Sequence, residues 1–211
     1  MSVFLQFLQY LLGRLLYPIR SHDSRQIIYC PAFNDISQPN MTIECDECGP
    51  SGSKMLPNHT CIADNGIGCF PELRWAPPAS TAPVKEYVLI CEDIDLPIPF
   101  LVIHHGLFWA IPPTATSAGP KEVELSQNSS DSYQTNAGWH FVPNAMGASY
   151  IGPGPPLGHG SHRYVFTIIA LNEPLVFQRP EKTTKSDIKN AMVGKIIGWG
   201  QWIGTFERSW H

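Results

Sequence analysis

The stretch from Tyr150 to Tyr164, YIGPGPPLGHGSHRY, combines a run of glycines and prolines with two imidazoles, His159 and His162, the guanidinium of Arg163 and two phenols. A segment so rich in glycine and proline forms neither a helix nor a regular strand, so we expect a fixed loop whose backbone can approach a ligand. Imidazole, guanidinium and phenol groups all donate hydrogen bonds to anions. The stretch therefore predicts an anion site where the following apolar run, VFTIIAL, begins as a strand.

A second group of ionisable residues lies between residues 92 and 105. Asp93 and Asp95 stand in the turn EDIDLP, directly after the predicted strand EYVLICED, and His104 and His105 stand together in the apolar run FLVIHHGLFWAI. Alternation along a strand places the two histidines on opposite faces. Taken singly, such an aspartate is most often a turn residue and such a histidine a core residue. A histidine next to a carboxylate, however, has a raised pKa and can donate to an anion.

Strands dominate the elements that would hold these groups. The residue patterns predict strands at 26–30, 41–45, 86–93, 100–111, 164–171 and 202–206. The run at 100–111 is apolar on both faces, which is typical of a strand in the centre of a sheet. Helical spacing is predicted at 1–17 and at 183–197, where Thr184 or Ser186 can cap the helix, and 114–138 reads as a polar surface loop.

The bulk composition is that of a globular, β-rich protein. The chain has 211 residues, of which 43% are hydrophobic and 15% charged, with 20 prolines and 17 glycines. Its formal net charge of -4 argues against nucleic acid as a partner, because no basic stripe is present to neutralise phosphates. We expect an N-terminal amphipathic helix at 1–25 and one domain at 26–211.

The six cysteines do not form a recognisable metal site. Cys45 and Cys48 have the spacing of half a zinc site, but no second pair follows with ligand spacing, since Cys61 and Cys69 are eight residues apart. Six cysteines in 211 residues are also too few for a disulfide scaffold. We therefore expect free thiols, no metal and no cofactor.

The apolar N-terminal stretch MSVFLQFLQYLLGRLLY leaves three interpretations open. It lacks the basic start and the small-residue cleavage site of a signal peptide, and Pro18 and Arg20 come too early for a membrane span. An amphipathic helix docked on the domain fits the pattern, and so do a membrane-surface helix and an atypical signal sequence. A cytoplasmic location is expected, with secretion left open.

Three motifs in this order resemble the phosphatidylethanolamine-binding protein family. The turn DIDLP at 93–97 stands where the family has DPDAP, and His105 precedes Pro112 by seven residues. The loop GPGPP at 152–156 leads to GSHRY at 160–164, as the family's loop GxGPP leads to GxHRY. The segments FPELRW at 70–75 and GWGQWIGTFER at 198–208 are similar to the fungal branch, and the resemblance spans about residues 27–208.

The resemblance implies a mainly β fold, an antiparallel sandwich of two sheets with flanking helices near the N- and C-termini. It also implies a pocket for small anions and phosphate head groups. Carried over position by position, the pocket residues are Asp93, His105, Gly154, Pro156, His162 and Tyr164. Asp93 would orient an imidazole and hold its proton, since a carboxylate repels an anion. Ile94 and Leu96 replace the family's proline and alanine, which implies a bulkier rim and a different or larger ligand.

Two functions follow from the resemblance. One is a ligand-binding or regulatory protein that holds a small anion, a phospholipid head group or a partner protein. The other is an enzyme of fungal secondary metabolism that assists the dimerisation of maleic-anhydride-type polyketide units into nonadrides. In the enzyme, His105, His162 and Asp93 would bind the substrate, stabilise enolate charge and move a proton. The sequence offers no nucleophile–base pair, so covalent catalysis is not expected.

Overall fold

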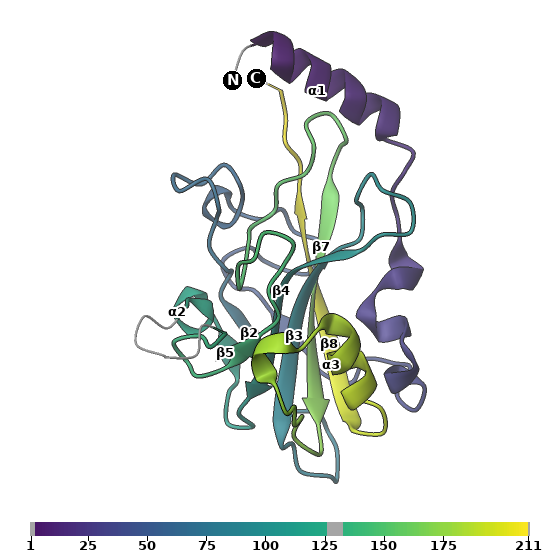
Figure 1. The fold of residues 1–211 in the computed structure, drawn as a ribbon, viewed down its shortest axis with the longest axis vertical. Coiled ribbons are helices and arrows are strands. Elements are labelled where there is room, and N and C mark those ends of the chain that lie inside the picture. The colour runs from purple at the N-terminus through teal and green to yellow at the C-terminus, as the bar shows by residue number, and fades with distance from the viewer. Residues whose placement is uncertain (1–2, 126–132, 211) are drawn as a thin grey trace.

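A computed structural model describes residues 3–125 and 133–210 of the chain (Figure 1). Its strands form two antiparallel sheets, which confirms the predicted sandwich. The smaller sheet has the order β1 (Ile43–Glu44), β2 (Leu73–Trp75), β5 (Ser117–Ala118). The larger sheet has the order β6 (His140–Phe141), β4 (Ile103–Ile111), β3 (Glu86–Asp93), β7 (His162–Leu171), β8 (Ile196–Phe206). The α-helices are α1 (Val3–Leu16), α2 (Pro120–Val123) and α3 (Lys185–Ala191).

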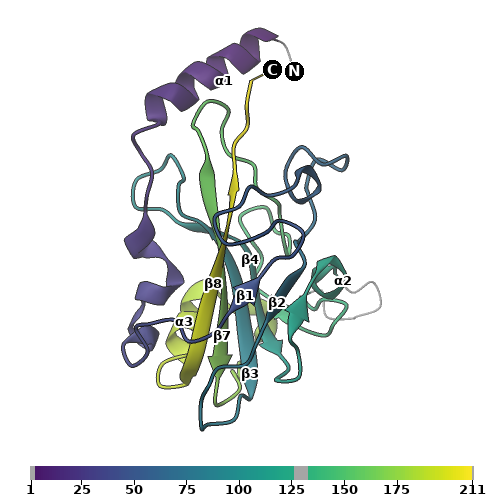
Figure 2. The ribbon, with the colours of Figure 1, turned by 180° about the vertical axis from the view of Figure 1, so that it is seen from behind.

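The larger sheet is buried on both faces. Along β3, Tyr87 and Leu89 belong to the core between the two sheets, whereas Val88 and Ile90 belong to a second core on the opposite face. Figure 1 shows α3 lying over this second face, and Figure 2 shows β1 and β2 covering the other. Apolar side chains on both sides explain why β3 reads as a nearly continuous hydrophobic run. The predicted alternation along β3 is confirmed.

The pairing of β3 with β4 contains a bulge that changes the direction of a histidine. Cys91 pairs with Gly106 and Glu92 pairs with His104, so His105 is an extra residue on β4. A bulge of this kind bends the strand and redirects the side chain of the extra residue. The His105 ring meets Tyr164 of the core between the sheets, whereas Nε2 of His104 lies 3.3 Å from the carbonyl oxygen of Val142, a residue of the second core. The two histidines therefore face opposite sides of the sheet, as predicted.

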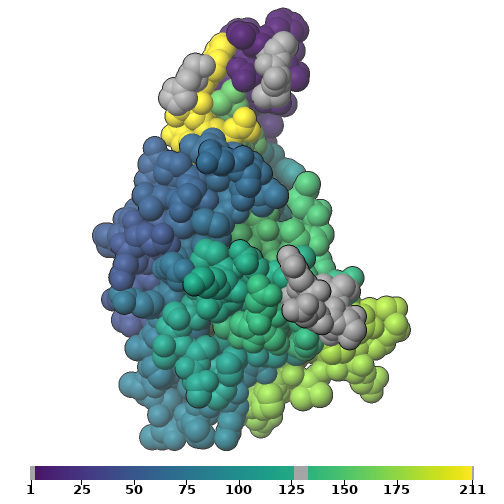
Figure 3. Space-filling view, turned by 90° about the vertical axis from the view of Figure 1, so that its left-hand side faces the viewer, coloured from purple at the N-terminus to yellow at the C-terminus, as the bar shows by residue number. Residues whose placement is uncertain are grey.

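Helix α1 lies outside the sandwich and forms a projection together with the C-terminal segment (Figure 3). Its rings Phe7 and Tyr10 pack on Trp210, with centroids 5.5 and 5.3 Å apart, and Gly13 is its buried residue. Of the three interpretations left open for this helix, docking is only partial, because most of the apolar face is exposed, with Phe4 70% and Leu15 76% accessible. Among the described residues no helix is long and apolar enough to cross a membrane.

Several predicted elements differ from the observed ones. Residues 26–30 form 3₁₀ turns rather than a strand, because backbone N–H groups of this segment bond to carbonyls three residues earlier or, at Ile27, to the Glu92 carboxylate. The last helix ends at Ala191, well before 197, since β8 begins at Ile196 and extends the predicted strand toward the N-terminus. Thr184 caps the helix as predicted, accepting from the Asp187 backbone.

The predicted loop 114–138 contains β5 and α2, and its part at 126–132 lies outside the described residues. Short 3₁₀ helices span Asp23–Arg25, Ile27–Tyr29, Pro31–Phe33, Pro57–His59 and Pro180–Lys182.

Candidate ligand site

A cavity of about 210 Å³ lies where the ends of β3 and β4 meet the glycine–proline loop. Five of the six predicted site residues line it: Asp93, His105, Gly154, Pro156 and Tyr164. Strand pairing explains why Asp93 and Tyr164 are together, since they face each other directly across β3 and β7. The cavity thus joins three segments that are far apart in the sequence.

His105 presents an unpaired ring nitrogen at this cavity. Its side chain is almost fully buried, and its Nδ1 lies 2.8 Å from the carbonyl oxygen of Ile151. A carbonyl only accepts, so Nδ1 carries the proton and Nε2 of the neutral ring carries the lone pair. Nε2 is buried and has no partner among the described residues. Burial lowers the pKa of His105, while the charge of Asp93 and the Ile151 carbonyl oppose this effect, so the ring is neutral near pH 7.

Tyr164 supplies a hydrogen-bond donor beside that nitrogen. Its ring is fully buried and meets the His105 ring edge-on, with centroids 5.1 Å apart. Within the described part of the chain its hydroxyl has no partner. Burial, followed by the charge of Asp93, raises the pKa of Tyr164 well above its usual value, so the hydroxyl stays protonated. A buried donor and a buried acceptor therefore stand together at one cavity, both unsatisfied.

The carboxylate of Asp93 faces a histidine behind the cavity wall. Its Oδ1 accepts the backbone N–H of Asp95 at 2.9 Å, and its Oδ2 lies 2.8 Å from Nδ1 of His162. His162 is fully buried and is not among the lining residues; it reaches the cavity through Asp93. Nε2 of His162 lies 2.7 Å from Nδ1 of His159, which is also buried. The predicted pairing of aspartate and imidazole is thus present, with His162 as the partner.

The glycine–proline loop is held against residues 59–69. The N–H of Gly152 donates to the carbonyl of Ile67 at 2.8 Å, and the carbonyl of Pro153 accepts from Cys61 at 2.8 Å. A Cβ on Gly152 would lie 2.3 Å from the carbonyl oxygen of His59, so this close approach requires glycine. These contacts fix the backbone that delivers Gly154 to the cavity.

Arg163 does not serve the cavity, although its type and position suggested an anion donor. Its guanidinium bonds to the carboxylates of Asp95 and Asp23, which fastens the segment after α1 to the sheet. Tyr150 likewise lines a different cavity, beside Cys69. Leu96 lines the candidate cavity, whereas Ile94 is buried and is not a lining residue, so only one of the two bulkier turn residues changes the rim.

Sequence reasoning missed further lining residues, including Asn144 and Met146. The side-chain oxygen of Asn144 accepts from the backbone of Met146 and Ala148 at 3.0 and 3.1 Å, and its amide donates to the His105 carbonyl. Asparagine that bonds its own turn is a recognised signal, and the run VPNAMG contains it.

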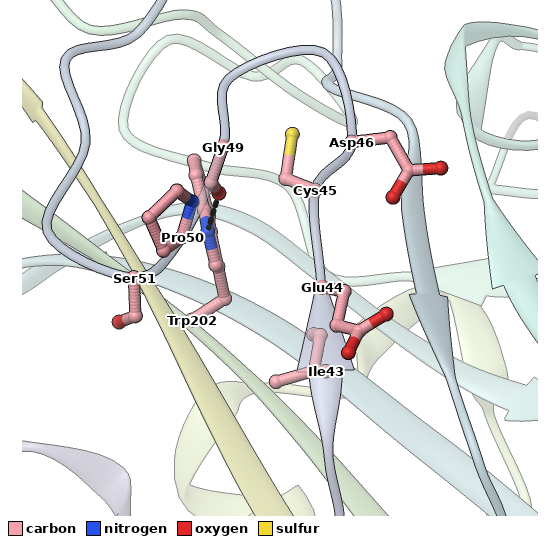
Figure 4. Close-up of a pocket in the computed structure, with 8 residues that line it drawn as sticks. All are labelled: Ile43, Glu44, Cys45, Asp46, Gly49, Pro50, Ser51 and Trp202. Carbon is pink, nitrogen blue, oxygen red and sulfur yellow. Dashed lines mark hydrogen bonds between the residues drawn. The ribbon is translucent and has the colours of Figure 1, made fainter.

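A cavity of about 440 Å³ beside β1 has different chemistry. Figure 4 shows the ring of Trp202 on one side of the turn that carries Cys45, and the carboxylates of Glu44 and Asp46 on the other. The indole N–H already donates to the Gly49 carbonyl at 3.0 Å, and the exposed carboxylates repel an anion. No group of three or more histidine, cysteine or acidic side chains that could hold a metal occurs among the described residues.

Comparison with known proteins decides the family. The pattern of the phosphatidylethanolamine-binding proteins matches residues 49–207. The chain belongs to the phosphatidylethanolamine-binding protein family. Two fungal relatives, each named phomoidride biosynthesis cluster protein B, confirm the predicted fungal affinity. One, from a fungal species, is 36% identical, and the match covers 100% of this chain and 99% of the relative. The other, from Talaromyces stipitatus, is also 36% identical, and the match covers 98% of this chain and 83% of the relative.

Solved structures of bacterial family members share the fold. A phosphatidylethanolamine-binding protein homologue from Chlamydia trachomatis has a TM-score of 0.59 at 23% identity, covering 81% of this chain and 99% of its own. E. coli YbcL, described as a member of the mammalian family, has a TM-score of 0.61 at 18% identity, and the match covers 80% of this chain and 99% of YbcL. At these identities the likeness concerns the fold alone.

Proposed function

We propose that this member of the phosphatidylethanolamine-binding protein family binds a small anionic ligand, a carboxylate or phosphate, in the cavity beside β3 and β4. The observation that carries the proposal is that His105 and Tyr164 line one cavity, and that Nε2 of the first and the hydroxyl of the second are buried and have no partner among the described residues. Buried polar groups are nearly always satisfied, so two such groups on residues of one cavity favour a ligand that satisfies both.

The protonation state of His105 determines how an anion would bind. The neutral ring presents a lone pair, which repels a fully ionised oxygen but accepts a proton from an acid. A ligand that arrives as dihydrogen phosphate or as a half-protonated dicarboxylate shares its acidic proton with Nε2 in a short hydrogen bond between anion and imidazole. Tyr164 then donates a second bond to the same anion. Such charge-assisted bonds contribute about 1.5–3 kcal/mol each.

The size of the cavity limits the ligand. Pockets for drug-sized molecules are about 300–1,000 Å³, whereas this cavity is about 210 Å³. It therefore suits a phosphate head group, a maleate-sized dicarboxylate, or one end of a larger molecule whose remainder extends past Leu96 and Met146.

Titration calorimetry with maleate and with inorganic phosphate tests the site. Tyr164→Phe removes only the donor hydroxyl and should weaken binding about 10- to 150-fold, the equivalent of one charge-assisted bond. Tyr87→Phe is the matched control, because the Tyr87 hydroxyl is also buried and unpaired but lies in the core away from the cavity. Equal effects of the two substitutions, or none from His105→Gln, would contradict the proposed site.

A second candidate function is catalytic. It is favoured by the two full-length relatives named for phomoidride biosynthesis clusters and by the lone pair of His105. In this function His105 removes a proton from carbon next to the carbonyl of a maleic-anhydride-type unit, and Tyr164 donates to the enolate oxygen that forms. The enolate carbon then attacks a second unit, and the imidazolium of His105 returns its proton to the new enolate that this attack forms.

Deuterium exchange separates catalysis from binding. Incubating a maleic-anhydride-type monomer with the protein in D2O should exchange the acidic carbon-bound hydrogen faster than buffer alone, and His105→Ala should abolish the difference. Mass spectrometry of the same samples detects dimer. If wild-type protein binds the monomer tightly but its carbon-bound hydrogen exchanges no faster than in buffer, the protein binds this ligand without catalysis and the catalytic role is excluded.

A further inference from the structure

Behind the cavity, three buried side chains form a continuous hydrogen-bonded chain that ends on the N-terminal segment. Asp93 contacts His162 at 2.8 Å, His162 contacts His159 at 2.7 Å, and Nε2 of His159 lies 3.0 Å from the carbonyl oxygen of Leu16 and 3.1 Å from that of Ile19. We call this the Asp93–His162–His159 chain. Its members are 2%, 0% and 0% exposed.

When the His159 ring is neutral, the two carbonyl oxygens fix the direction of every bond in the chain. Because carbonyls only accept, Nε2 of His159 carries a proton, and in the neutral ring its Nδ1 is an acceptor. Nε2 of His162 must then donate to it. The contact between Nδ1 of His162 and Asp93 also contains a proton, on either the nitrogen or the oxygen. Asp93 and His162 thus share two protons, one in each contact. A carboxylate beside a neutral imidazole holds only one, so the pair carries one extra proton and has no net charge.

We infer that His159 is a positioning residue that, with the carbonyls of Leu16 and Ile19, keeps this extra proton on the Asp93–His162 pair and so cancels the negative charge of Asp93 at the cavity wall. The part of this inference that concerns ligands rests on the proposed function. The cavity then offers an anion the donor of Tyr164 without a repelling carboxylate. The N-terminal segment becomes part of the site, although it contributes no lining residue.

The charges and burial around His159 favour placing the extra proton on Asp93 and His162 rather than on His159. Burial lowers the pKa of His159, and the charge of His162 lowers it further, while the Leu16 and Ile19 carbonyls oppose both effects. Arg20, which bonds the carbonyl of Ser161, is a further positive charge near His159.

The other charged groups around the chain are already paired or neutral. Asp95 is bound by Arg163 and the Ser21 N–H. On the cavity side, Asp93 faces the neutral His105 and Tyr164, and the buried thiol of Cys91 has a raised pKa. No second cation among these groups neutralises Asp93, which leaves His162 as its counter-charge.

Nitrogen-detected NMR of protein labelled with 15N-histidine tests the proton positions directly. We expect Nε2 of His162 to be protonated and Nδ1 of His159 to be unprotonated at pH 7. The reverse pattern, with the proton on Nδ1 of His159 and a lone pair on Nε2 of His162, would overturn the inference whatever the ligand affinity.

Phosphate titrations of two His159 variants test the consequence. His159→Leu cannot accept from His162, so His162 can lose its Nε2 proton, Asp93 stays uncompensated, and phosphate should bind about tenfold or more weakly. His159→Gln has an oxygen for His162 and an amide for the carbonyls, and should restore most of the affinity. Equal affinities of the Leu variant and wild type would refute the charge role. If wild type has the expected proton pattern but binds no phosphate, the anion site is wrong and the proton pattern stands.

Discussion

Asp95 is the buried carboxylate that ties the segment after α1 to the sheet, and its replacement by asparagine should destabilise the fold strongly. Its Oδ1 accepts from the Ser21 N–H at 2.9 Å and from Nη2 of Arg163 at 2.8 Å; its Oδ2 accepts from the backbone N and Nε of Arg163 at 2.9 and 2.8 Å. In either orientation, an asparagine amide points its NH2 group at two donors and loses two of these four bonds.

The structure gives the size of the effect. Two lost charge-assisted bonds cost about 1.5–3 kcal/mol each, and removing one partner of a buried pair costs about 3–5 kcal/mol. Asp95 is fully buried, but the Arg163 side chain is 32% exposed, so water relieves part of the loss. We therefore expect Asp95→Asn to lower the free energy of unfolding by about 3–4 kcal/mol.

Urea unfolding followed by fluorescence measures this loss. Asp46→Asn is the control, because Asp46 also pairs with an arginine, Arg74, but is 64% exposed; it should change stability by less than about 1 kcal/mol. A loss below about 1 kcal/mol for Asp95→Asn would refute the reasoning that this pair fastens the segment.

The same carboxylate predicts a pH dependence. Burial alone would raise the pKa of Asp95, but the hydrogen bonds and charge of Arg163, with the Ser21 N–H, outweigh it, so the pKa is lowered. A lowered folded-state pKa means that this stabilisation is complete above the unfolded value of 3.8 and is lost as the pH falls through the folded value. Asp95→Asn should lose little further stability in this acidic range, compared with wild type.

Three other predictions follow from packing, protonation and exposure. Gly152→Ala should cost about 1–3 kcal/mol, because its Cβ would lie 2.3 Å from the His59 carbonyl oxygen. Gly154→Ala, whose Cβ meets its nearest atom at 3.4 Å, should be near neutral in urea unfolding. Three histidines, two buried and one half-buried, have pKa values lowered mainly by desolvation, so the melting temperature should fall as the pH drops below the ordinary value of 6.5, where the unfolded chain takes up protons first. They are His104, His105 and His159. Finally, the exposed apolar face of α1 predicts co-sedimentation with phosphatidylcholine vesicles, and replacing Phe4 and Leu15 by serine should reduce it; no binding by wild type would contradict this prediction.

Local sequence patterns predicted the fold well where burial alternates regularly along an element or where a capping residue marks its start. The alternation in EYVLICED gave the two buried faces of β3, and the Thr184 cap gave the start of α3. Prediction failed at residues 26–30, where apolar side chains pack on the sheet from 3₁₀ turns and Glu92 takes the N–H of Ile27. An apolar run shows that a segment is buried, but not which backbone bonds it makes.

The amino-acid sequence by itself determined the stiff loop at 152–156, the strand ends that carry Asp93 and Tyr164, and the family to which these motifs belong. Only the tertiary structure decided that a bulge turns His105 into the cavity and that His159 bonds a carbonyl 143 residues away at Leu16. The physical reason is that backbone periodicity and turn chemistry act between neighbours in the chain. The partner of a buried polar group, in contrast, depends on which distant segments meet when the two sheets and the N-terminal segment close around it.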